Sequence, residues 1–204
     1  LLFFEHFSGR PERVGDLGVL GAFFQSITAR TAGLNTVPMA EMTASSKTIL
    51  ILLMFIGGAP GSTAGGVKNV TLVILLMAVV AMLRKRGEVE MFRRSVRDVM
   101  VDRALTVVTL FVVVLFTASL GLSVTESPYP QGFTMLDFMF EAASALGTVG
   151  LTTGVTPTLT TAGKLIIIVV MLIGRLGPLT MVAALTFNLK PARYNYPDEA
   201  IIVG

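Results

Sequence analysis

The sequence contains no cysteine and a single histidine, His6. Without cysteine, the chain forms no disulfide, no thiolate metal site and no cysteine nucleophile. With a single histidine, neither a metal site built from several histidines nor a histidine-based catalytic triad is expected. Charged residues make up 14% of the chain, against about 25% in a typical soluble domain. We therefore expect no enzyme, no catalytic residue and no cofactor in this chain.

Apolar residues are abundant instead, at 53% of the chain with a mean hydropathy of +0.77, which indicates a polytopic membrane protein. Crossing about 30 Å of hydrocarbon takes about 20 residues. Three apolar stretches are long enough: residues 48–83, 104–124 and 165–189. Residues 17–28 and 133–146 are apolar but too short to span. We interpret both as re-entrant helices that enter the membrane partway and turn back.

Basic residues gather between the first two spans and in the C-terminal tail, whereas residues 125–146 contain acidic but no basic side chains. Positive charge is enriched in cytoplasmic loops. The basic loop and the tail, with Lys190 and Arg193, are therefore expected on the cytoplasmic side. Both short apolar segments then enter from the outer side.

The first span is interrupted by GGAPGSTAGG, residues 57–66. Glycine weakens a helix by about 1 kcal/mol and proline by about 3 kcal/mol. In lipid, each freed backbone group must find another partner. Such an interruption therefore requires a functional reason.

The sequence repeats itself at an offset of 117 positions without a gap. The matched polar and glycine pairs are Thr31 with Thr148, Gly33 with Gly150, Thr36 with Thr153, Thr43 with Thr160, Lys47 with Lys164, and Gly57 with Gly174. The repeated unit is a short helix, a T-x-G segment, a lysine and a spanning helix. Repeats in membrane proteins usually indicate pseudo-symmetry about a transport pathway.

Each repeat places a polar segment directly after a short helix: ARTAGLNT at residues 29–36 and LGTVGLTTG at residues 146–154. Non-helical backbone at membrane depth is tolerated where it lines a cavity or is buried in protein. A row of carbonyls facing an axis can replace the water shell of a monovalent cation. The negative C-terminal end of the preceding helix favours a cation there. Thr134 followed by Asp137 predicts an N-cap for the second short helix.

These motifs resemble known proteins. Thr148-Val149-Gly150-Leu151 is similar to the potassium-channel filter TVGYG with the tyrosine replaced. Arg30-Thr31-Ala32-Gly33-Leu34-Asn35 resembles the third filter loop of the Trk/Ktr/HKT superfamily of potassium transporters. GGAPGSTAGGVK resembles the glycine-rich break of that family, and Arg175 stands in the place of the arginine in its last helix. The ending RYNYPDEAIIVG is more similar to Ktr-type than to Trk-type membrane subunits.

The resemblance implies an all-α polytopic membrane protein built from helix–pore loop–helix units, with a potassium-channel-like pore and a broken membrane helix. Residues 1–83 would be the third pore repeat with a truncated first helix, and residues 104–189 the fourth. Residues 84–103 would be the basic cytoplasmic loop, and residues 190–204 the cytoplasmic tail. The family builds its pore from four repeats, so we expect two upstream repeats in a natural chain roughly twice this length.

The candidate site residues fall into two groups. The ion-filter residues are Arg30, Thr31, Ala32, Gly33, Gly147, Thr148, Val149 and Gly150. Potassium would bind the backbone carbonyls of Thr31, Ala32, Gly33, Thr148, Val149 and Gly150. The gate residues are Gly57, Gly58, Gly61, Ser62, Thr63, Gly65, Gly66 and Arg175. Arg175 would hold the glycine loop shut by bonding its carbonyls, or clamp broken helix ends. Asn35 and Thr152 would brace the filter from behind, and Arg30 would form an outer salt bridge.

We therefore expect potassium uptake through a carbonyl-lined filter gated by the glycine loop. Within the family, serine at an equivalent filter position is linked to sodium passage, so Gly33 and Gly150 favour potassium. A sodium-permeable transporter of the same superfamily and a non-conducting structural or receptor protein remain alternatives. A nucleotide-binding loop is disfavoured because Lys68 is displaced from the G-x-x-x-x-G-K-[ST] pattern. The acidic residues Glu5, Glu41, Glu126 and Glu141 are interpreted as solvated or capping groups.

The resemblance also implies partners for the chain. These are the upstream repeats, a second copy in a homodimer, with the C-terminal IIVG as a contact, and a cytoplasmic ring of nucleotide-binding regulatory subunits. The transported ion is K⁺, with Na⁺ as a possible activator. We expect a multi-pass protein of the cell membrane and no nucleic-acid partner.

Overall fold

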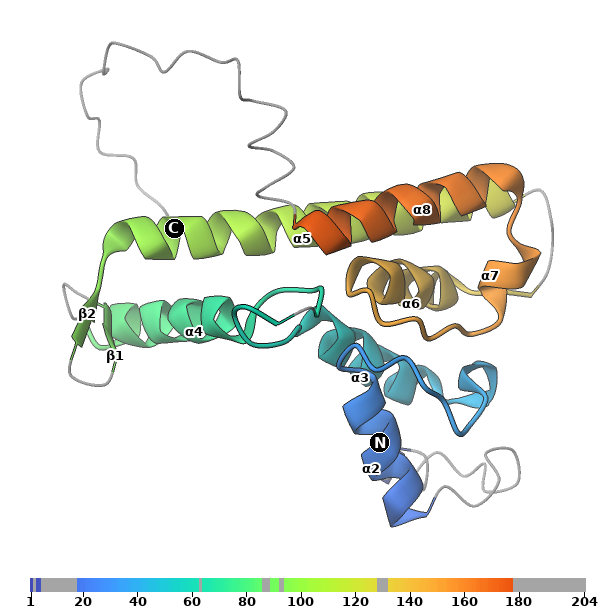
Figure 1. Cartoon of the computed structure of the whole chain (residues 1–204), viewed down its shortest axis with the longest axis horizontal. Coiled ribbons are helices and arrows are strands. Elements are labelled where there is room, and N and C mark those ends of the chain that lie inside the picture. The colour runs from blue at the N-terminus through green and yellow to red at the C-terminus, as the bar shows by residue number, and fades with distance from the viewer. Residues whose placement is uncertain are drawn as a thin grey trace, which may run out of the picture.

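The structure is a computed structural model that describes residues 1, 3–4, 18–62, 64–85, 89–91, 94–127 and 132–177. Helices dominate these residues (Figure 1). In chain order the main elements are α2 (Val19–Thr28), η1 (Met39–Glu41), α3 (Ala44–Phe55), α4 (Asn69–Leu83), β1 (Val89–Met91), β2 (Arg94–Val96), α5 (Asp98–Glu126), α6 (Met135–Leu146), α7 (Val155–Thr158) and α8 (Thr161–Leu176).

The apolar stretches of the sequence correspond to helices with different bounds. Residues 48–83 form α3 and α4, which flank the glycine segment, so neither helix alone has the length of a span. α5 is the helix in the described residues that is long and apolar enough to cross a membrane, judged by length and composition. α8 is described to Leu176, and the rest of the expected third span lies outside the described residues, as does the tail.

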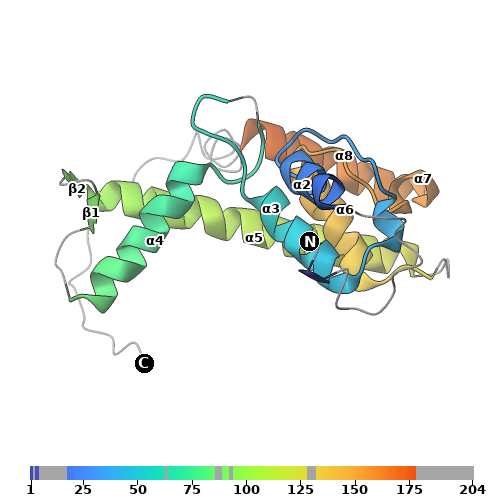
Figure 2. The same cartoon turned by 90° about the horizontal axis from the view of Figure 1, so that it is seen from below.

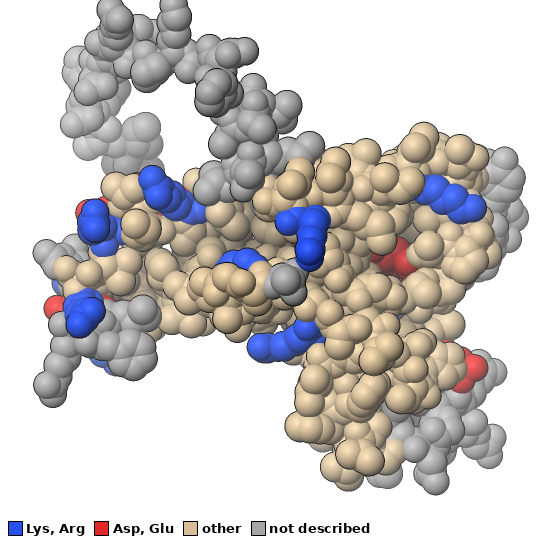
Figure 3. All heavy atoms as spheres, in the orientation of Figure 1, with Lys and Arg blue, Asp and Glu red and all other residues tan. Residues whose placement is uncertain are grey.

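The basic loop differs from the expectation of an all-α chain. β1 and β2 form a two-stranded antiparallel hairpin in which Val89 pairs with Val96. α5 then begins at Asp98, six residues before the predicted span at Ala104. A carboxylate in the first turn is stabilised by the positive end of the helix dipole, so the helix extends beyond its apolar stretch. Figure 3 shows lysine and arginine side chains gathered at this end of the molecule.

α6 lies at the centre of the packing, against α3, α5 and α8 (Figures 1 and 2). Its side chains from Phe140 through Leu146 are all buried. Phe140 of α6, Met54 of α3 and Leu122 of α5 are completely inaccessible and belong to one core cluster. A helix this short is stable here because its neighbours surround it, since isolated helices of this length are marginal in water.

The two repeats have the same backbone pattern at the predicted offset. Thr43 and Thr160 are the N-caps of α3 and α8. Their hydroxyl oxygens accept hydrogen bonds from the amides of Ser46 (3.3 Å) and Gly163 (3.2 Å). α2 and α6 both end directly before their T-x-G segments.

An ion pair joins the two repeats. The Lys47 ammonium on α3 lies 2.8 Å from Oδ1 of Asp137 on α6, and both side chains are nearly buried. Oδ2 of the same carboxylate accepts from the amide (2.9 Å) and the hydroxyl (2.8 Å) of Thr134, which is the N-cap predicted from the sequence. The Asp137 carboxylate therefore both caps the start of α6 and joins α6 to α3.

Asp137→Asn should destabilise the fold because it leaves the Lys47 ammonium without its counter-charge in a nearly buried position. The expected loss is about 3 kcal/mol in the free energy of unfolding. Asp102→Asn on the exposed side of α5 is the matched control and should change it by less than about 0.5 kcal/mol. Denaturant unfolding of the purified protein in detergent measures both, and equal effects would contradict the role of the pair.

Candidate functional site: two T-x-G segments and a glycine loop

Both T-x-G segments have the same unusual backbone. Four residues lie in the left-handed region while Ala32 and Val149 between them do not; these four are Thr31 (φ 67°), Gly33 (φ 72°), Thr148 (φ 53°) and Gly150 (φ 95°). Left-handed backbone is a genuine outlier for a β-branched residue such as threonine. Such strained backbone clusters at functional sites, where the surrounding structure enforces it.

The two segments lie directly against each other. A Cβ atom placed on Gly33 would meet the Val149 carbonyl oxygen at 2.1 Å, and one placed on Gly150 would lie 3.9 Å from the Gly33 Cα. The first distance is far below any real contact, so Gly33 is required by the close approach of the second segment as well as by its positive φ.

The amides of the segments bond back to the short helices. The amides of Ala32 and Gly33 donate to the Thr28 carbonyl at 3.1 and 3.2 Å, and the Val149 amide donates to the Ser144 carbonyl at 2.9 Å. In a trans peptide the C=O points opposite to the N–H. The carbonyls of Thr31, Ala32 and Thr148 therefore point away from the helices that precede them. This arrangement leaves oxygen atoms, rather than amides, on the outer side of each turn.

The first segment is braced by uncharged groups. The Leu34 amide donates to the Thr28 hydroxyl oxygen at 2.9 Å, and that hydroxyl in turn donates to the Leu34 carbonyl. Gln25, which is completely buried, lies within 3.3 Å of the Thr36 hydroxyl. Arg30 and Asn35 are exposed, so Asn35 does not brace the segment from a buried position.

The second segment is braced by a buried carboxylate, Glu141. Its Oε1 accepts from the Thr152 hydroxyl (2.6 Å) and from the Thr153 amide (2.8 Å) and hydroxyl (3.2 Å). Its Oε2 accepts from the Thr156 hydroxyl. The sequence predicts a solvated or capping role for Glu141, whereas the structure buries it, with 3% of its surface exposed. The signal that could have revealed it is the run of threonines that follows Gly150.

The glycine loop, residues 57–66, is closed at its neck. Ile56 and Val67 form a parallel bridge, in which the Gly57 amide donates to the Val67 carbonyl (2.9 Å) and the Val67 amide donates to the Phe55 carbonyl (3.0 Å). A Cβ on Gly57 would meet the Gly65 carbonyl oxygen at 2.0 Å. The freed backbone groups of the broken helix are thus paired with each other, and glycine permits the close approach.

The loop also contacts the start of the second T-x-G segment. The Gly65 amide donates to the Thr148 hydroxyl oxygen at 3.1 Å. A Cβ on Gly65 would lie 2.7 Å from the Gly147 carbonyl oxygen. The loop therefore lies at the end of the segment that adjoins α6.

The remaining gate candidates occupy different surroundings. Gly66 has positive φ and packs on Gly57, a Cβ on Gly58 would meet the Ser62 hydroxyl at 2.6 Å, and Gly61 stands in open space. Thr63 lies outside the described residues.

A lysine binds the loop carbonyls. Lys68 Nζ donates to the carbonyls of Ala64 (2.7 Å) and Ser62 (3.3 Å). Arg175 is exposed in the last turn of α8, and its contact with the loop stays a prediction. It follows Gly174, where a Cβ would meet the Leu146 carbonyl oxygen at 2.1 Å. Arg175 is therefore one residue beyond the close contact between α8 and the C-terminal end of α6.

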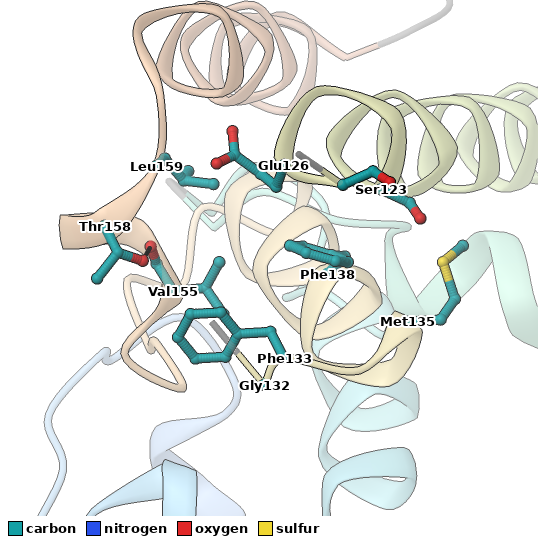
Figure 4. Close-up of a pocket in the computed structure, with 10 residues that line it drawn as sticks. Ser123, Glu126, Gly132, Phe133, Met135, Phe138, Val155, Thr158 and Leu159 are labelled. Atoms are coloured by element: carbon teal, nitrogen blue, oxygen red, sulfur yellow. Dashed lines mark hydrogen bonds between the residues drawn. The ribbon is translucent and has the colours of Figure 1, made fainter. Parts of the chain in front are cut away.

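A separate pocket of about 220 Å³ lies between the ends of α5, α6 and α7, and its lining residues belong to neither T-x-G segment (Figure 4). Figure 4 shows the Glu126 carboxylate pointing toward Leu159, away from the apolar pair of Phe133 and Val155. This carboxylate accepts from the Thr160 hydroxyl at 2.7 Å and so caps the start of α8. Of the two roles expected from the sequence, solvated or capping, Glu126 has the capping one.

A largely helical chain in which short helices end at paired left-handed segments beside a broken apolar helix is similar to membrane cation transporters. Residues 14–195 match the family described as TrkH, cation transport protein. The chain belongs to this family, and the resemblance to Trk and Ktr proteins is confirmed. The crystal structure of the potassium transporter TrkH from Vibrio parahaemolyticus matches with a TM-score of 0.64 and 25% identity, covering 81% of this chain and 36% of that one.

Curated relatives agree with this assignment. Ktr system potassium uptake protein B of Bacillus subtilis is 40% identical, over 95% of this chain and 43% of its own length. Potassium/sodium uptake protein NtpJ of Enterococcus hirae is 44% identical, over 89% of this chain and 41% of its own length. The chain thus spans about two-fifths of these relatives. The family consists of transporters and not enzymes, as expected.

Glu141→Gln should disturb the second segment because an amide nitrogen cannot accept a hydrogen bond from Thr156. We expect a loss of about 1–3 kcal/mol in stability and a lower ratio of potassium to sodium uptake in the full-length transporter. Glu126→Gln, a buried carboxylate that caps α8, is the matched control. It should lower stability similarly without changing the ion ratio, measured by radiotracer uptake. An unchanged ratio in both variants would contradict the bracing role.

Proposed function

We propose that this chain supplies two helix–pore loop–helix units to a potassium uptake pore in the cell membrane. The carbonyls of Thr31, Ala32, Gly33, Thr148, Val149 and Gly150 form part of the ion filter. The observation that carries this proposal is the matching left-handed backbone at both T-x-G segments, which touch at Gly33 and Val149. A filter of this kind replaces the hydration shell of the ion with main-chain oxygens.

The helix ends support the same conclusion. α2 and α6 both end at the filter segments, so their negative C-terminal ends lie next to the proposed ion pathway. A cation is stabilised there by the aligned peptide dipoles. Arg30 lies beside α2 and is exposed, which fits an outer salt bridge better than an ion contact.

Potassium is favoured over sodium as the transported ion. The relatives include a potassium uptake protein and a potassium/sodium uptake protein, so the family relationship alone leaves both ions open. Glycine stands at both filter positions, and Gly33 has no room for a side chain. A sodium-permeable transporter is the second candidate, since NtpJ is named for both ions.

The glycine loop is proposed as the gate of this pore. Gly65 contacts Thr148 at the end of the filter segment that adjoins α6, where a loop across the pathway would block the ion. The lysine ammonium on the loop carbonyls places a positive charge beside this point. Arg175 from the facing helix adds a second cation, whose charge would oppose a passing potassium ion.

The assembly proposed for the whole transporter follows the Ktr relatives. The upstream part of the protein would supply further pore repeats, and two copies would form a homodimer. A ring of nucleotide-binding regulatory subunits would bind the cytoplasmic side, where the basic hairpin lies, and Na⁺ would act as an activator. The basic end and the C-terminus would be cytoplasmic.

The full-length transporter should restore growth of an uptake-deficient strain in limiting potassium and should take up rubidium faster than sodium. Gly33→Ser should reduce this ion ratio more than Gly150→Ser, because a Cβ on Gly33 meets the Val149 oxygen. Gly132→Ser is the matched control, since Gly132 has φ +73 and nothing within 4 Å. If well-folded transporter fails to restore growth, potassium uptake is refuted. Equal ion ratios in all variants would refute the filter assignment.

Deleting residues 61–65 should raise potassium flux in the full-length transporter, because the part of the loop that touches Thr148 is removed while the neck hydrogen bonds remain possible. The measurement is the maximal rate of rubidium uptake, normalised to protein in the membrane. Unchanged or lower flux in protein that unfolds at the same temperature as the wild type would count against a gate.

A further inference from the structure

Exposed basic side chains meet at the end of the molecule where α4 ends, the hairpin of β1 and β2 follows and α5 begins (Figure 1). We call this end the basic surface. Its exposed cations are Arg84 and Lys85 after α4, Arg94 on β2, and Arg97 and Arg103 at the start of α5. Their blue side chains lie at the left of Figure 3.

The basic surface has an excess of positive charge. Residues 84–103 contain seven basic and four acidic residues, which gives this segment a net charge of +3. Among the described residues, the structure records no carboxylate partner for Arg84, Arg94 or Arg97, whereas it pairs Lys47 with Asp137. The three guanidinium groups can therefore bind an anion from outside the chain.

The hairpin separates an acidic residue from these cations. Val89 pairs with Val96 across the two strands, and residues directly opposite each other share one face of an antiparallel pair. Because side chains alternate along a strand, Arg94 lies on the same face as Val96. Glu90 and Ser95 lie on the other face. One side of the hairpin thus combines two valines with an arginine.

Exposed apolar side chains border the same charges. Leu83 directly precedes Arg84 and is 78% exposed, and Val99 in the first turn of α5 is 54% exposed. The exposed apolar surface continues along both helices, at Leu76 of α4 and Leu105 of α5. At a membrane interface, basic side chains extend their charged heads toward water while their apolar stems stay on apolar surface. This continuity favours lipid over a soluble protein as the occupant.

We propose that the basic surface binds the headgroups of anionic phospholipids in the cytoplasmic leaflet. The guanidinium groups of Arg84, Arg94 and Arg97 bind the phosphate oxygens, because a planar guanidinium donates parallel hydrogen bonds to such groups. The acyl chains of the same lipids contact Leu83 and Val99. The inference goes beyond the proposed function and requires only that this end of the chain lies at the cytoplasmic side of the membrane.

Fluorescence quenching of a tryptophan at position 83 tests which lipid lies at the basic surface. The chain has no tryptophan, so Leu83→Trp in the full-length transporter, with any upstream tryptophan replaced by phenylalanine, reports on this position. The protein is reconstituted with brominated phosphatidylglycerol or brominated phosphatidylcholine. We expect binding to favour phosphatidylglycerol by about fivefold or more at low salt, since each basic side chain near an anionic membrane contributes about that factor. Salt at about 0.5 M should reduce the preference by screening.

Two triple variants test the three arginines. Arg84→Gln, Arg94→Gln and Arg97→Gln combined should abolish the preference for phosphatidylglycerol. The matched control replaces the same three residues by lysine and should retain most of the preference, because the charge is kept. A preference that survives in the glutamine variant would overturn the proposal.

The two remaining outcomes of the quenching experiment also contradict the proposal. Equal quenching by both lipids would show that the surface does not select anionic headgroups. Quenching by neither lipid would show that protein covers position 83, in favour of a subunit contact. Because no step measures transport, selective binding of phosphatidylglycerol by a protein that takes up no potassium would refute the proposed function alone.

Discussion

The structure depends on one constraint: backbone that leaves the helix in apolar surroundings must have its polar groups satisfied nearby. The chain meets this constraint three times with different partners. The amides of both T-x-G segments bond back to the last turns of α2 and α6, and the groups freed at the broken helix bond across the neck of the glycine loop. In the T-x-G segments the amides of Ala32, Gly33 and Val149 are used in this way, so the carbonyls of the same peptide units point outward. Outward-facing carbonyl oxygens suit the coordination of a bare cation.

The same constraint also brings backbone segments very close to one another. Gly33, Gly57, Gly65 and Gly174 each face a carbonyl oxygen at a distance that excludes a side chain. These contacts lie between the two T-x-G segments, at the neck of the loop, between the loop and Gly147, and where α8 crosses the end of α6. At these four positions glycine serves close packing of the backbone rather than flexibility of the chain. Among the glycines of the loop, Gly61 is the one that combines positive φ with open space.

Local patterns and the repeat allowed the sequence to predict the family, the short helices, the N-cap at Thr134 and the interruption of the first span. The interactions that were missed are long-range or specific to one repeat. Lys47 and Asp137 are 90 positions apart, and no local periodicity relates them. Glu141 has Phe24 at its equivalent position, so the repeat did not point to it. Lys68 binds the carbonyls of Ala64 and Ser62, a contact that no sequence motif marks. The hairpin lies in a basic segment, whose charge predicts orientation in the membrane rather than strands.

The parallel bridge between Ile56 and Val67 has a mechanical consequence. It brings the end of α3 next to the start of α4, so the intervening residues form a side branch rather than a spacer. The branch can be rearranged while the two half-helices keep their alignment. A force applied along α4 would instead act directly on the bridge, since its two backbone hydrogen bonds join the start of α4 to the end of α3 without passing through the loop.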